Sequence, residues 1–250
     1  MSPSCYSSDF SPNWKKLKSD LSNKHKSLRN AKFNNKKIRN RKKSNYRPIE
    51  KNQTEENRPK QTSSQHTLTK CVAMDCEMVG TGYGGKNSVL ARVSIVNSNM
   101  ECIYDKYVLP MESVTDYRTQ YSGIRPDNLR DAIDFKTVQS EVFEIIKNRI
   151  LIGHSIKQDL KVLFLSHPWS MIRDTSVYFK KFNKNRTPAL KKLSESYLDV
   201  KIQEGEHDSV VDAKAAMSLY NLYKKNWEYS LRARHRKRNQ KHSNTLQKES

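Results

Sequence analysis

Apolar positions become regular only after residue 70. The segment 1–70 is rich in Lys, Asn and Ser and shows almost no apolar periodicity, so it buries too little surface to offset the entropy lost on ordering. Three runs of strand-forming residues then follow: CVAMDCEMV (71–79), LARVSIVN (90–97) and ECIYDKYVL (101–109). The turn-prone Ser98 and Asn99 separate the last two runs. The pattern predicts a disordered arm followed by an antiparallel meander of three strands.

The remainder of the chain alternates between helical and strand patterns. The apolar spacing predicts a helix over 135–148, a short buried strand over 149–154, an amphipathic helix over 155–167 and a short strand over 170–176. Two final helices are predicted over 189–200, directly after Pro188 in a helix-opening position, and over 209–227. Meandering strands followed by helix and strand units indicate an α/β layer fold with a mixed sheet. The ribonuclease H-like architecture is one fold with this order of elements.

Charge divides the chain into three parts. The formal net charge is +21, of which residues 1–70 carry +13 and residues 230–250 carry +6, leaving +2 for residues 71–229. We therefore expect one folded domain over 71–229 between disordered basic N-terminal (1–70) and C-terminal (230–250) tails, both suited to a polyanion such as RNA or DNA. The basic runs 34–43 and 232–242 fit a nuclear or nucleolar targeting signal or a nucleic-acid contact. A solubilising charged tail is the alternative.

The sequence shows neither a membrane span nor a secretion signal. No apolar run approaches the roughly 18 to 20 residues needed to cross a bilayer, and the opening stretch MSPSCYSSDF lacks the apolar core of a signal peptide. We expect a soluble, intracellular protein without membrane contact. The cysteines at positions 5, 71, 76 and 102 have no C-x-x-C spacing, which indicates free thiols in a reducing compartment rather than a zinc site.

The first predicted strand contains two carboxylates, Asp75 and Glu77, separated by a single residue. Side chains alternate faces along a strand, so both point to one side while Cys76 points to the other. Taken alone, this spacing fits a solvent-facing edge strand equally well, but the apolar flanks on both sides favour a central strand. Ionised groups are costly to bury without a positive partner, so the pair predicts a bound cation.

A third carboxylate, Asp159, lies in the first turns of the helix predicted over 155–167. Leu160, Leu163 and Phe164 define the apolar face of that helix and leave Asp159 at its boundary. A surface acid is therefore a strong alternative interpretation of this residue. His154, at the end of the preceding strand, is a candidate ligand, although a single histidine at such a position is more often structural.

The last helix opens with a histidine and two acids, in the segment EGEHDSVVDAKAAM (204–217). The helix is predicted to begin near Asp208 or Ser209, either of which is a competent N-cap. His207 and Asp212 would lie about 140° out of register if both were helical, so His207 is expected on the preceding loop, free to swing over a site that Asp212 helps to form. Asp208 competes for the ligand role because it shares a helix face with Asp212.

These signals follow a recognisable order: Asp-x-Glu on the first strand, Asp on a middle helix, and His-x4-Asp opening the last helix. In this order the chain resembles the DEDDh exonuclease superfamily. Five segments are similar to the RNA exonuclease 4 family, whose relatives include the interferon-induced exonucleases. They are DCEMVGTG (75–82), LARVSIVN (90–97), VTDYRTQYSGIRPDNL (114–129), HPWSMIRDTSVY (167–178) and EGEHDSVVDAKAAM (204–217). The resemblance covers about residues 71–227, nearly the whole of the predicted domain.

The resemblance implies a ribonuclease H-like fold and 3′ to 5′ hydrolysis of nucleic acid from a free end with two divalent ions, Mg²⁺ or Mn²⁺. It implies that His207 is the general base and that Met78 and Arg118 contact the terminal nucleotide. The metal-binding carboxylates would be Asp75, Glu77, Asp159 and Asp212. Oxygen ligands suit such hard ions, and the lack of Cys or several His at the proposed centre disfavours zinc or copper.

The implied substrate is single-stranded RNA, or else DNA, with a free 3′ end. Precursors of ribosomal RNA are the expected target, the nucleus and in particular the nucleolus the expected location, and a monomer the expected state. Arg92, Arg118 and Arg125 lie in or beside the loops expected to rim the site and would contact phosphates, with an aromatic or Met wedge against the terminal base. Each of these arginines could equally be a surface cation.

Two stretches depart from the family pattern. Lys157 and Gln158 stand where relatives commonly have His-Asn before the middle acid, and Tyr83 stands where they have Pro in the glycine loop. Neither change removes a metal ligand, and both bear on substrate handling. Two rival functions stay open: a DNA exonuclease in repair, since metal chemistry at phosphate does not inspect the 2′-hydroxyl, and a non-catalytic RNA-binding scaffold that uses the basic arms.

Overall fold

The computed structural model describes residues 67–246, with the side chains of the final helix described up to Arg236, apart from His235. The predicted N-terminal arm lies, up to residue 66, outside the described residues, as do residues 247–250. Within 67–246, no helix is both long enough and apolar enough to cross a membrane.

The three strands predicted at the start of the domain form an antiparallel meander, as expected. They are β1 (Cys71–Thr81), β2 (Asn87–Asn97) and β3 (Cys102–Leu109). In the pairing of β1 with β2, Glu77 lies opposite Arg92, and the register shifts directly after Glu77. Irregularities of this kind redirect side chains and are common next to active sites. β1 lies inside the sheet and is buried along most of its length, so the prediction of a central strand is confirmed.

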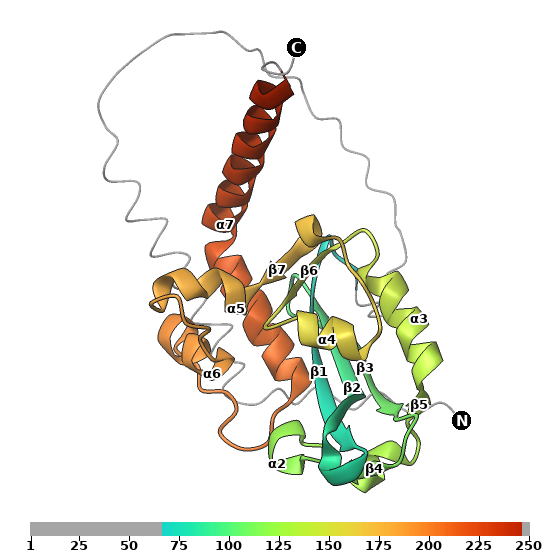
Figure 1. Cartoon of the computed structure of the whole chain (residues 1–250). Coiled ribbons are helices and arrows are strands. Elements are labelled where there is room, and N and C mark those ends of the chain that lie inside the picture. The colour runs from blue at the N-terminus through green and yellow to red at the C-terminus, as the bar shows by residue number, and fades with distance from the viewer. Residues whose placement is uncertain (1–66, 247–250) are drawn as a thin grey trace, which may run out of the picture. The chain divides into compact units, whose positions relative to one another are not determined.

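Parallel strands extend the sheet on the other side of β1. β6 (Ile150–Gly153) pairs with β1, and β7 (Ile172–Asp174) pairs with β6. At the opposite edge of the sheet, β5 (Ile133–Asp134) runs parallel to β3. β4 (Val114–Asp116) lies outside the main strand order and pairs antiparallel with the end of β1. The strand order is β5-β3-β2-β1-β6-β7. This mixed sheet flanked by helices confirms the predicted α/β, ribonuclease H-like fold (Figure 1).

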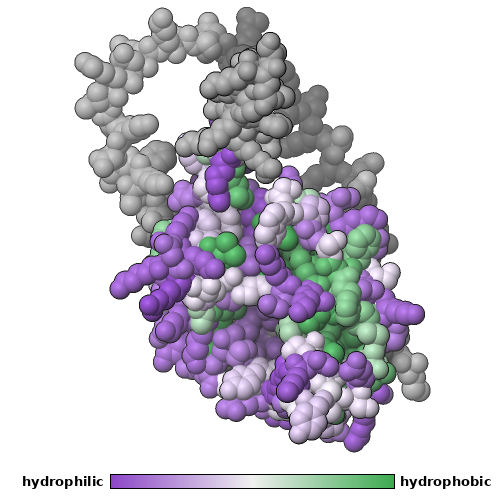
Figure 2. All heavy atoms as spheres, viewed as in Figure 1, coloured by the Kyte–Doolittle hydropathy of each residue, from purple (hydrophilic) through white to green (hydrophobic). Residues whose placement is uncertain are grey.

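α3 (Phe135–Ile146) and α4 (Lys157–Val162) share one apolar core cluster with β1. α4 ends earlier than predicted because Phe164 adopts a φ of 49°, and the bond of 2.9 Å from the Leu165 amide to the Leu160 carbonyl closes the helix end. Phe164 is consequently 72% exposed, so its predicted place on the buried face is wrong. Figure 2 shows an apolar area of surface over this part of the molecule.

α7 (Ser209–Leu246) packs against β1, β2 and β6 (Figure 1). Its first turns bury the small residues Ala213 and Ala216, which allow the helix to approach the sheet closely. Side chains alternate along β1, and the face of β1 that α7 covers is the one that carries Asp75 and Glu77. The start of α7 is thereby placed directly over this acidic pair.

α7 is longer than the helix predicted over 209–227 and continues through the segment expected to be a disordered tail. Arg, Lys and Gln are good helix formers, and extending a helix costs far less than starting one. Its middle is anchored to the body: Arg173 Nε donates to Glu228 Oε1 at 2.7 Å, and Trp227 stacks on Tyr178 with 3.9 Å between ring centroids. The predicted start of a disordered tail at residue 230 is therefore wrong for the part of the tail that the structure describes.

The helix predicted over 189–200 is divided into two pieces. α6 (Leu190–Leu193) is followed by a π-helical turn (Ser194–Leu198), which ends where Asp199 adopts a φ of 60°. Ala189 is the N-cap of α6, so Pro188 precedes the helix instead of opening it. The remaining short helices are α2 (Thr119–Ser122) and α5 (Thr175–Tyr178), with 3₁₀ turns over 83–85, 126–129, 169–171 and 179–182.

Candidate active site

Three carboxylates from opposite ends of the domain sequence meet on one face of the sheet. One oxygen each from Asp75, Glu77 and Asp212 lies within 4.8 Å of the others. Asp75 and Glu77 come from β1, and Asp212 comes from the first turn of α7. The docking of α7 on β1 therefore builds the cluster, because neither element alone carries more than two of the acids.

Asp159 joins the site from α4, although it does not belong to this group of three. Its side chain is almost fully buried, and its Oδ1 accepts a hydrogen bond of 2.9 Å from the backbone amide of Cys76. The alternative interpretation as a surface acid is therefore wrong. The charge of Asp159 is close enough to Asp75 to raise the pKa of that carboxyl, second only to the effect of burial.

Burial makes the ionised state of these acids unfavourable. Burial, followed by the charges of Asp159 and Asp212, raises the pKa of Asp75 well above its usual value. Burial and the charge of Asp212 raise the pKa of Glu77 to about 8, against the opposing effect of Arg92. Burial also raises the pKa values of Asp159 and Asp212 to about 7 each. The cluster thus needs a positive partner to hold its full charge at neutral pH.

Two atoms of the cluster have no hydrogen-bond partner among the described residues. Glu77 Oε1 and Asp212 Oδ1 are both buried and unpaired, although buried polar atoms are nearly always paired. Carboxylate oxygens are the ligands that hard divalent ions such as Mg²⁺ and Mn²⁺ prefer. The donor set, its burial and its unpaired oxygens all fit such a cation.

The raised pKa values predict a pH-dependent stability. A carboxyl whose folded-state pKa lies above its unfolded value stabilises the fold fully below the unfolded pKa and loses this contribution as the pH rises through the folded pKa. In the presence of a chelator, Glu77→Gln should therefore gain melting temperature relative to the unchanged protein as the pH rises from about 5 to about 9. Calorimetric melting curves at each pH measure this difference.

The control for this measurement is Glu112→Gln, which neutralises an exposed carboxylate and should show no such trend. Partly buried histidines such as His167, whose pKa is lowered by desolvation, titrate equally in all three proteins and cancel in the difference. Added Mn²⁺ should raise the melting temperature of the unchanged protein more than that of Glu77→Gln. A difference between Glu77→Gln and the unchanged protein that stays flat with pH would contradict the electrostatic account of the cluster.

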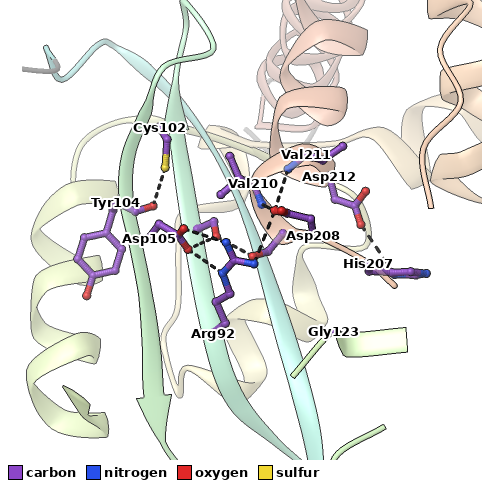
Figure 3. A network of polar contacts seen from close by, with 12 residues as sticks. Arg92, Cys102, Tyr104, Asp105, Gly123, His207, Asp208, Val210, Val211 and Asp212 are labelled. Carbon is purple, nitrogen blue, oxygen red and sulfur yellow. Dashed lines mark hydrogen bonds and ion pairs between the residues drawn. The ribbon is translucent and has the colours of Figure 1, made fainter. Parts of the chain in front are cut away.

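His207 lies on the loop before α7, as predicted. Its Nδ1 is 3.9 Å from Asp212 Oδ2, and its side chain is 33% exposed (Figure 3). Its backbone amide donates to the Tyr121 carbonyl at 3.2 Å, and a Cβ on Gly123 would lie only 2.8 Å from the His207 carbonyl oxygen. Burial and the charge of Lys191 lower the pKa of His207. Both effects favour the neutral imidazole, the form that can accept a proton.

Asp208 caps α7 and does not join the acidic group of three. Its Oδ1 accepts from the amide of Val210 at 2.9 Å and from that of Val211 at 3.4 Å, and lies 3.6 Å from an Arg92 nitrogen (Figure 3). Ser209, the other candidate cap, instead shares a buried hydroxyl contact of 2.6 Å with Ser94. Of the two competing acids, Asp212 lies in the group of three and Asp208 does not, and the ligand role of Asp212 stays a prediction.

Arg92 is held inside a network of ion pairs and is not a free rim cation. It donates two bonds of 2.8 Å to Asp105, and only 14% of its side chain is exposed. It lies opposite Glu77 in the sheet and pairs with Asp208 at the start of α7 (Figure 3). These ion pairs give Arg92 a role in joining β2, β3 and α7, and a contact of Arg92 with phosphate stays a prediction.

Met78 and Arg118 make contacts with the core and with the glycine turn, respectively. Met78 follows the register shift in β1, is half-buried and packs against the core cluster. The Arg118 guanidinium donates to the Gly85 carbonyl at 2.6 Å and to Ser88 Oγ at 2.8 Å. Arg118 thus holds the glycine turn, in which Tyr83 is 91% exposed.

Two other residues singled out from the sequence make structural contacts. Arg125 pairs with Glu206, with nitrogen to oxygen distances of 2.8 and 2.5 Å, and so links the segment after α2 to the loop that carries His207. His154 Nδ1 lies 2.9 Å from Thr175 Oγ1. His154 is not a member of the acidic group, in agreement with its structural interpretation.

Sequence reasoning missed Gln203 and Lys191. Gln203 Nε2 donates to Asp212 Oδ2 at 2.7 Å, and Lys191 Nζ donates to the Gln203 carbonyl at 2.8 Å. Gln203 lies in an irregular loop, where no periodic pattern marks a residue as facing a site. The same loop forms one wall of a cavity of about 520 Å³, lined by Gln120, Tyr121, Gln203, Glu204, Gly205, Glu206 and His207.

Comparison with known sequences covers most of the described domain. A family model, RNase_T, described as exonuclease, matches residues 72–220. RNA exonuclease 4 of Xenopus laevis is 56% identical over 170 residues, 67% of this chain and 40% of that protein. The Homo sapiens protein of that name is 54% identical over 169 residues, 67% of this chain and 40% of that protein, and the Debaryomyces hansenii protein is 49% identical over 170 residues, 67% and 62% respectively. The matched part of the chain thus spans less than two thirds of each relative.

Solved structures with the same fold include RNA exonuclease modules. The catalytic unit of Neurospora crassa Pan2, a protease and nuclease domain, has a TM-score of 0.58 at 26% identity, covering 70% of this chain and 31% of that one. A Saccharomyces cerevisiae Pan2 module, described as pseudoubiquitin hydrolase and RNA exonuclease in complex with AAUUAA RNA, has a TM-score of 0.57 at 27% identity, covering 67% of this chain and 32% of that one.

Proposed function

Because the chain belongs to the RNase_T exonuclease family and is similar to RNA exonuclease 4 proteins, we propose that it hydrolyses RNA from a free 3′ end with two divalent ions, Mg²⁺ or Mn²⁺. The observation that carries the proposal is the meeting of Asp75, Glu77 and Asp212, with two buried oxygens left unpaired. A buried acidic cluster of this kind is a poor structural element and a good cation site.

Hydrolysis of a phosphodiester builds negative charge on a centre that is already anionic, so the working site must be electrostatically positive. When bound, two divalent ions would supply this positive charge. Asp75, Glu77, Asp159 and Asp212 would hold the ions. The hydrogen bond from the Cys76 amide to Oδ1 would hold the Asp159 carboxylate in place for this role.

His207 would act on the attacking water. Its neutral imidazole accepts a proton at a ring nitrogen, and its loop lies at the edge of the acidic cluster, within 3.9 Å of Asp212. The bond from the His207 amide to Tyr121 and the pairing of Glu206 with Arg125 hold the backbone of this loop. The imidazole itself is one-third exposed, which leaves it room to reach a water molecule above the cluster.

We propose that Met78 and Arg118 contact the terminal nucleotide, Met78 through its thioether side chain against the base. Arg118 also holds the glycine turn through its bond to the Gly85 carbonyl. The proposed substrate is single-stranded RNA, in keeping with the names of the relatives and with the RNA-bound yeast module. Precursor ribosomal RNA as the target, a nucleolar location and a monomeric state are further parts of the proposal. The basic runs of the tails support the first two of these parts.

The test is a degradation assay with the full chain and matched RNA and DNA oligonucleotides labelled at the 5′ end. We expect RNA to shorten stepwise from the 3′ end in the presence of Mg²⁺ or Mn²⁺ and to stay intact with a chelator. Faster shortening of DNA than of RNA would instead identify a DNA exonuclease. RNA that is bound but not cleaved under any metal condition would overturn the proposal in favour of an RNA-binding scaffold.

A further inference from the structure

The Asp212 carboxylate is held by one oxygen and left open at the other. Oδ2 accepts the bond of 2.7 Å from Gln203 Nε2, while Oδ1 is buried without a partner among the described residues. A carboxylate can turn about its side-chain torsion, which is broad for this residue type. The bond to Oδ2 removes that freedom and fixes Oδ1 as the oxygen available to a cation.

Gln203 is itself fixed in an uncommon backbone conformation. Its φ is 55°, in the left-handed region that residues other than glycine rarely occupy and that costs on the order of 1 kcal/mol or more. The adjacent Ile202 is buried, and Lys191 of α6 donates to the Gln203 carbonyl at 2.8 Å. The strained conformation is therefore held from two sides, and it aims the amide at Asp212.

The chemistry of an amide suits this position. A neutral N–H donor orients a carboxylate without cancelling its charge, whereas a lysine or arginine would form an ion pair and compete with a cation for the same group. Glutamate would add a like charge to a cluster in which burial already raises the pKa of Asp212 to about 7. Glutamine is long enough to reach Asp212, carries an N–H donor and has no charge.

We propose that Gln203 is a positioning residue that orients Asp212 for metal binding and that Lys191 fixes Gln203 for this task. This inference rests on the proposed function, because it assumes that the acidic cluster binds divalent ions. Groups that hold a metal ligand in place typically contribute a factor of about 10 to 100 in metal affinity. The effect should appear in metal binding itself and not only in turnover.

The experiment measures Mn²⁺ binding to the full chain by isothermal titration calorimetry, without RNA. Gln203→Gly removes the amide and tolerates a positive φ, so it isolates the loss of the hydrogen bond. We expect it to weaken Mn²⁺ binding about 10- to 100-fold, and Lys191→Met to weaken it in the same direction by less. In turnover assays the kcat of Gln203→Gly should recover at high Mn²⁺ while its KM for RNA stays unchanged.

The matched control is Gln120→Ala, which removes an exposed amide from the same cavity and should bind Mn²⁺ like the unchanged protein. If Gln203→Gly melts too low to be titrated, Gln203→Asn replaces it, because asparagine tolerates a positive φ and its shorter side chain draws the amide away from Asp212. We expect this variant to weaken Mn²⁺ binding as well. Mn²⁺ binding by Gln203→Gly or Gln203→Asn equal to that of the unchanged protein would overturn the inference alone. Absence of Mn²⁺ binding to the unchanged protein would instead overturn the proposed function.

Discussion

Asp75→Asn should lower the rate of metal-dependent RNA hydrolysis by at least about 10³-fold, because it removes a charge from the centre of the acidic cluster. Asparagine has nearly the same shape, so packing of β1 is preserved. Burial and four neighbouring acids disfavour the ionised form of Asp75 and raise its pKa. The substitution should therefore raise the melting temperature of the metal-free protein at about pH 8 while it removes activity.

The rate is measured with 5′-labelled RNA at saturating Mn²⁺ and the stability by melting curves with chelator. Asp131→Asn, which neutralises an exposed acid, is the matched control and should change neither quantity. A gain in stability together with a loss of activity in Asp75→Asn would show that the Asp75 carboxylate serves activity and not folding. Near-normal turnover by Asp75→Asn would remove Asp75 from the site, and lost activity accompanied by a lower melting temperature would make its role structural.

The spacing of Asp75 and Glu77 was readable from the sequence because strand periodicity alone decides which side chains share a face. The burial of Asp159 was not readable, because a helix boundary position is compatible with either solvent or core. Only the fold brings the Cys76 amide within 2.9 Å of its carboxylate. Local periodicity thus determines the direction in which a side chain points, whereas its burial depends on which element packs over it.

Arg92 and Gln203 show two further limits. From the sequence, a single arginine in a strand fits a surface cation. The ion pairs that nearly bury Arg92 depend on Asp105 and Asp208, which reach it from another strand and from the start of α7. Gln203 lies in an irregular loop without helix or strand periodicity, so no sequence pattern marks it as facing the site. Such residues become visible only through contacts between segments that lie far apart in the chain.

The length of α7 illustrates a third limit. The sequence places its apolar half correctly, but the charged half lacks apolar residues at helical spacing and so gives no periodic signal. Continuation of the helix depends on intrinsic propensity and on the anchor between Arg173 and Glu228, which fixes the turns immediately before the charged segment. A helix that is already nucleated and packed extends at low cost.

His207→Ala should reduce kcat by about 10²- to 10⁴-fold, the range expected for loss of a general base, with little change in RNA or Mn²⁺ affinity. The imidazole lies 3.9 Å from Asp212, on a loop whose backbone is held independently by Tyr121 and by the Arg125–Glu206 pair. Removing the ring should therefore leave the loop and the acidic cluster in place. Single-turnover kinetics with labelled RNA, together with calorimetric Mn²⁺ titration, separate these effects.

The control for this substitution is His167→Gln, since His167 bonds the Arg149 carbonyl and should affect stability more than catalysis. Partial recovery of the His207→Ala rate by added imidazole would support proton transfer at this position. An equal loss of Mn²⁺ affinity and kcat would show that His207 shapes the cluster through Asp212 instead of acting on water. Gln203→Gly is expected to lose metal affinity, whereas His207→Ala is expected to lose turnover. The two variants therefore divide the loop before α7 into a segment that orients a metal ligand and a segment that moves a proton.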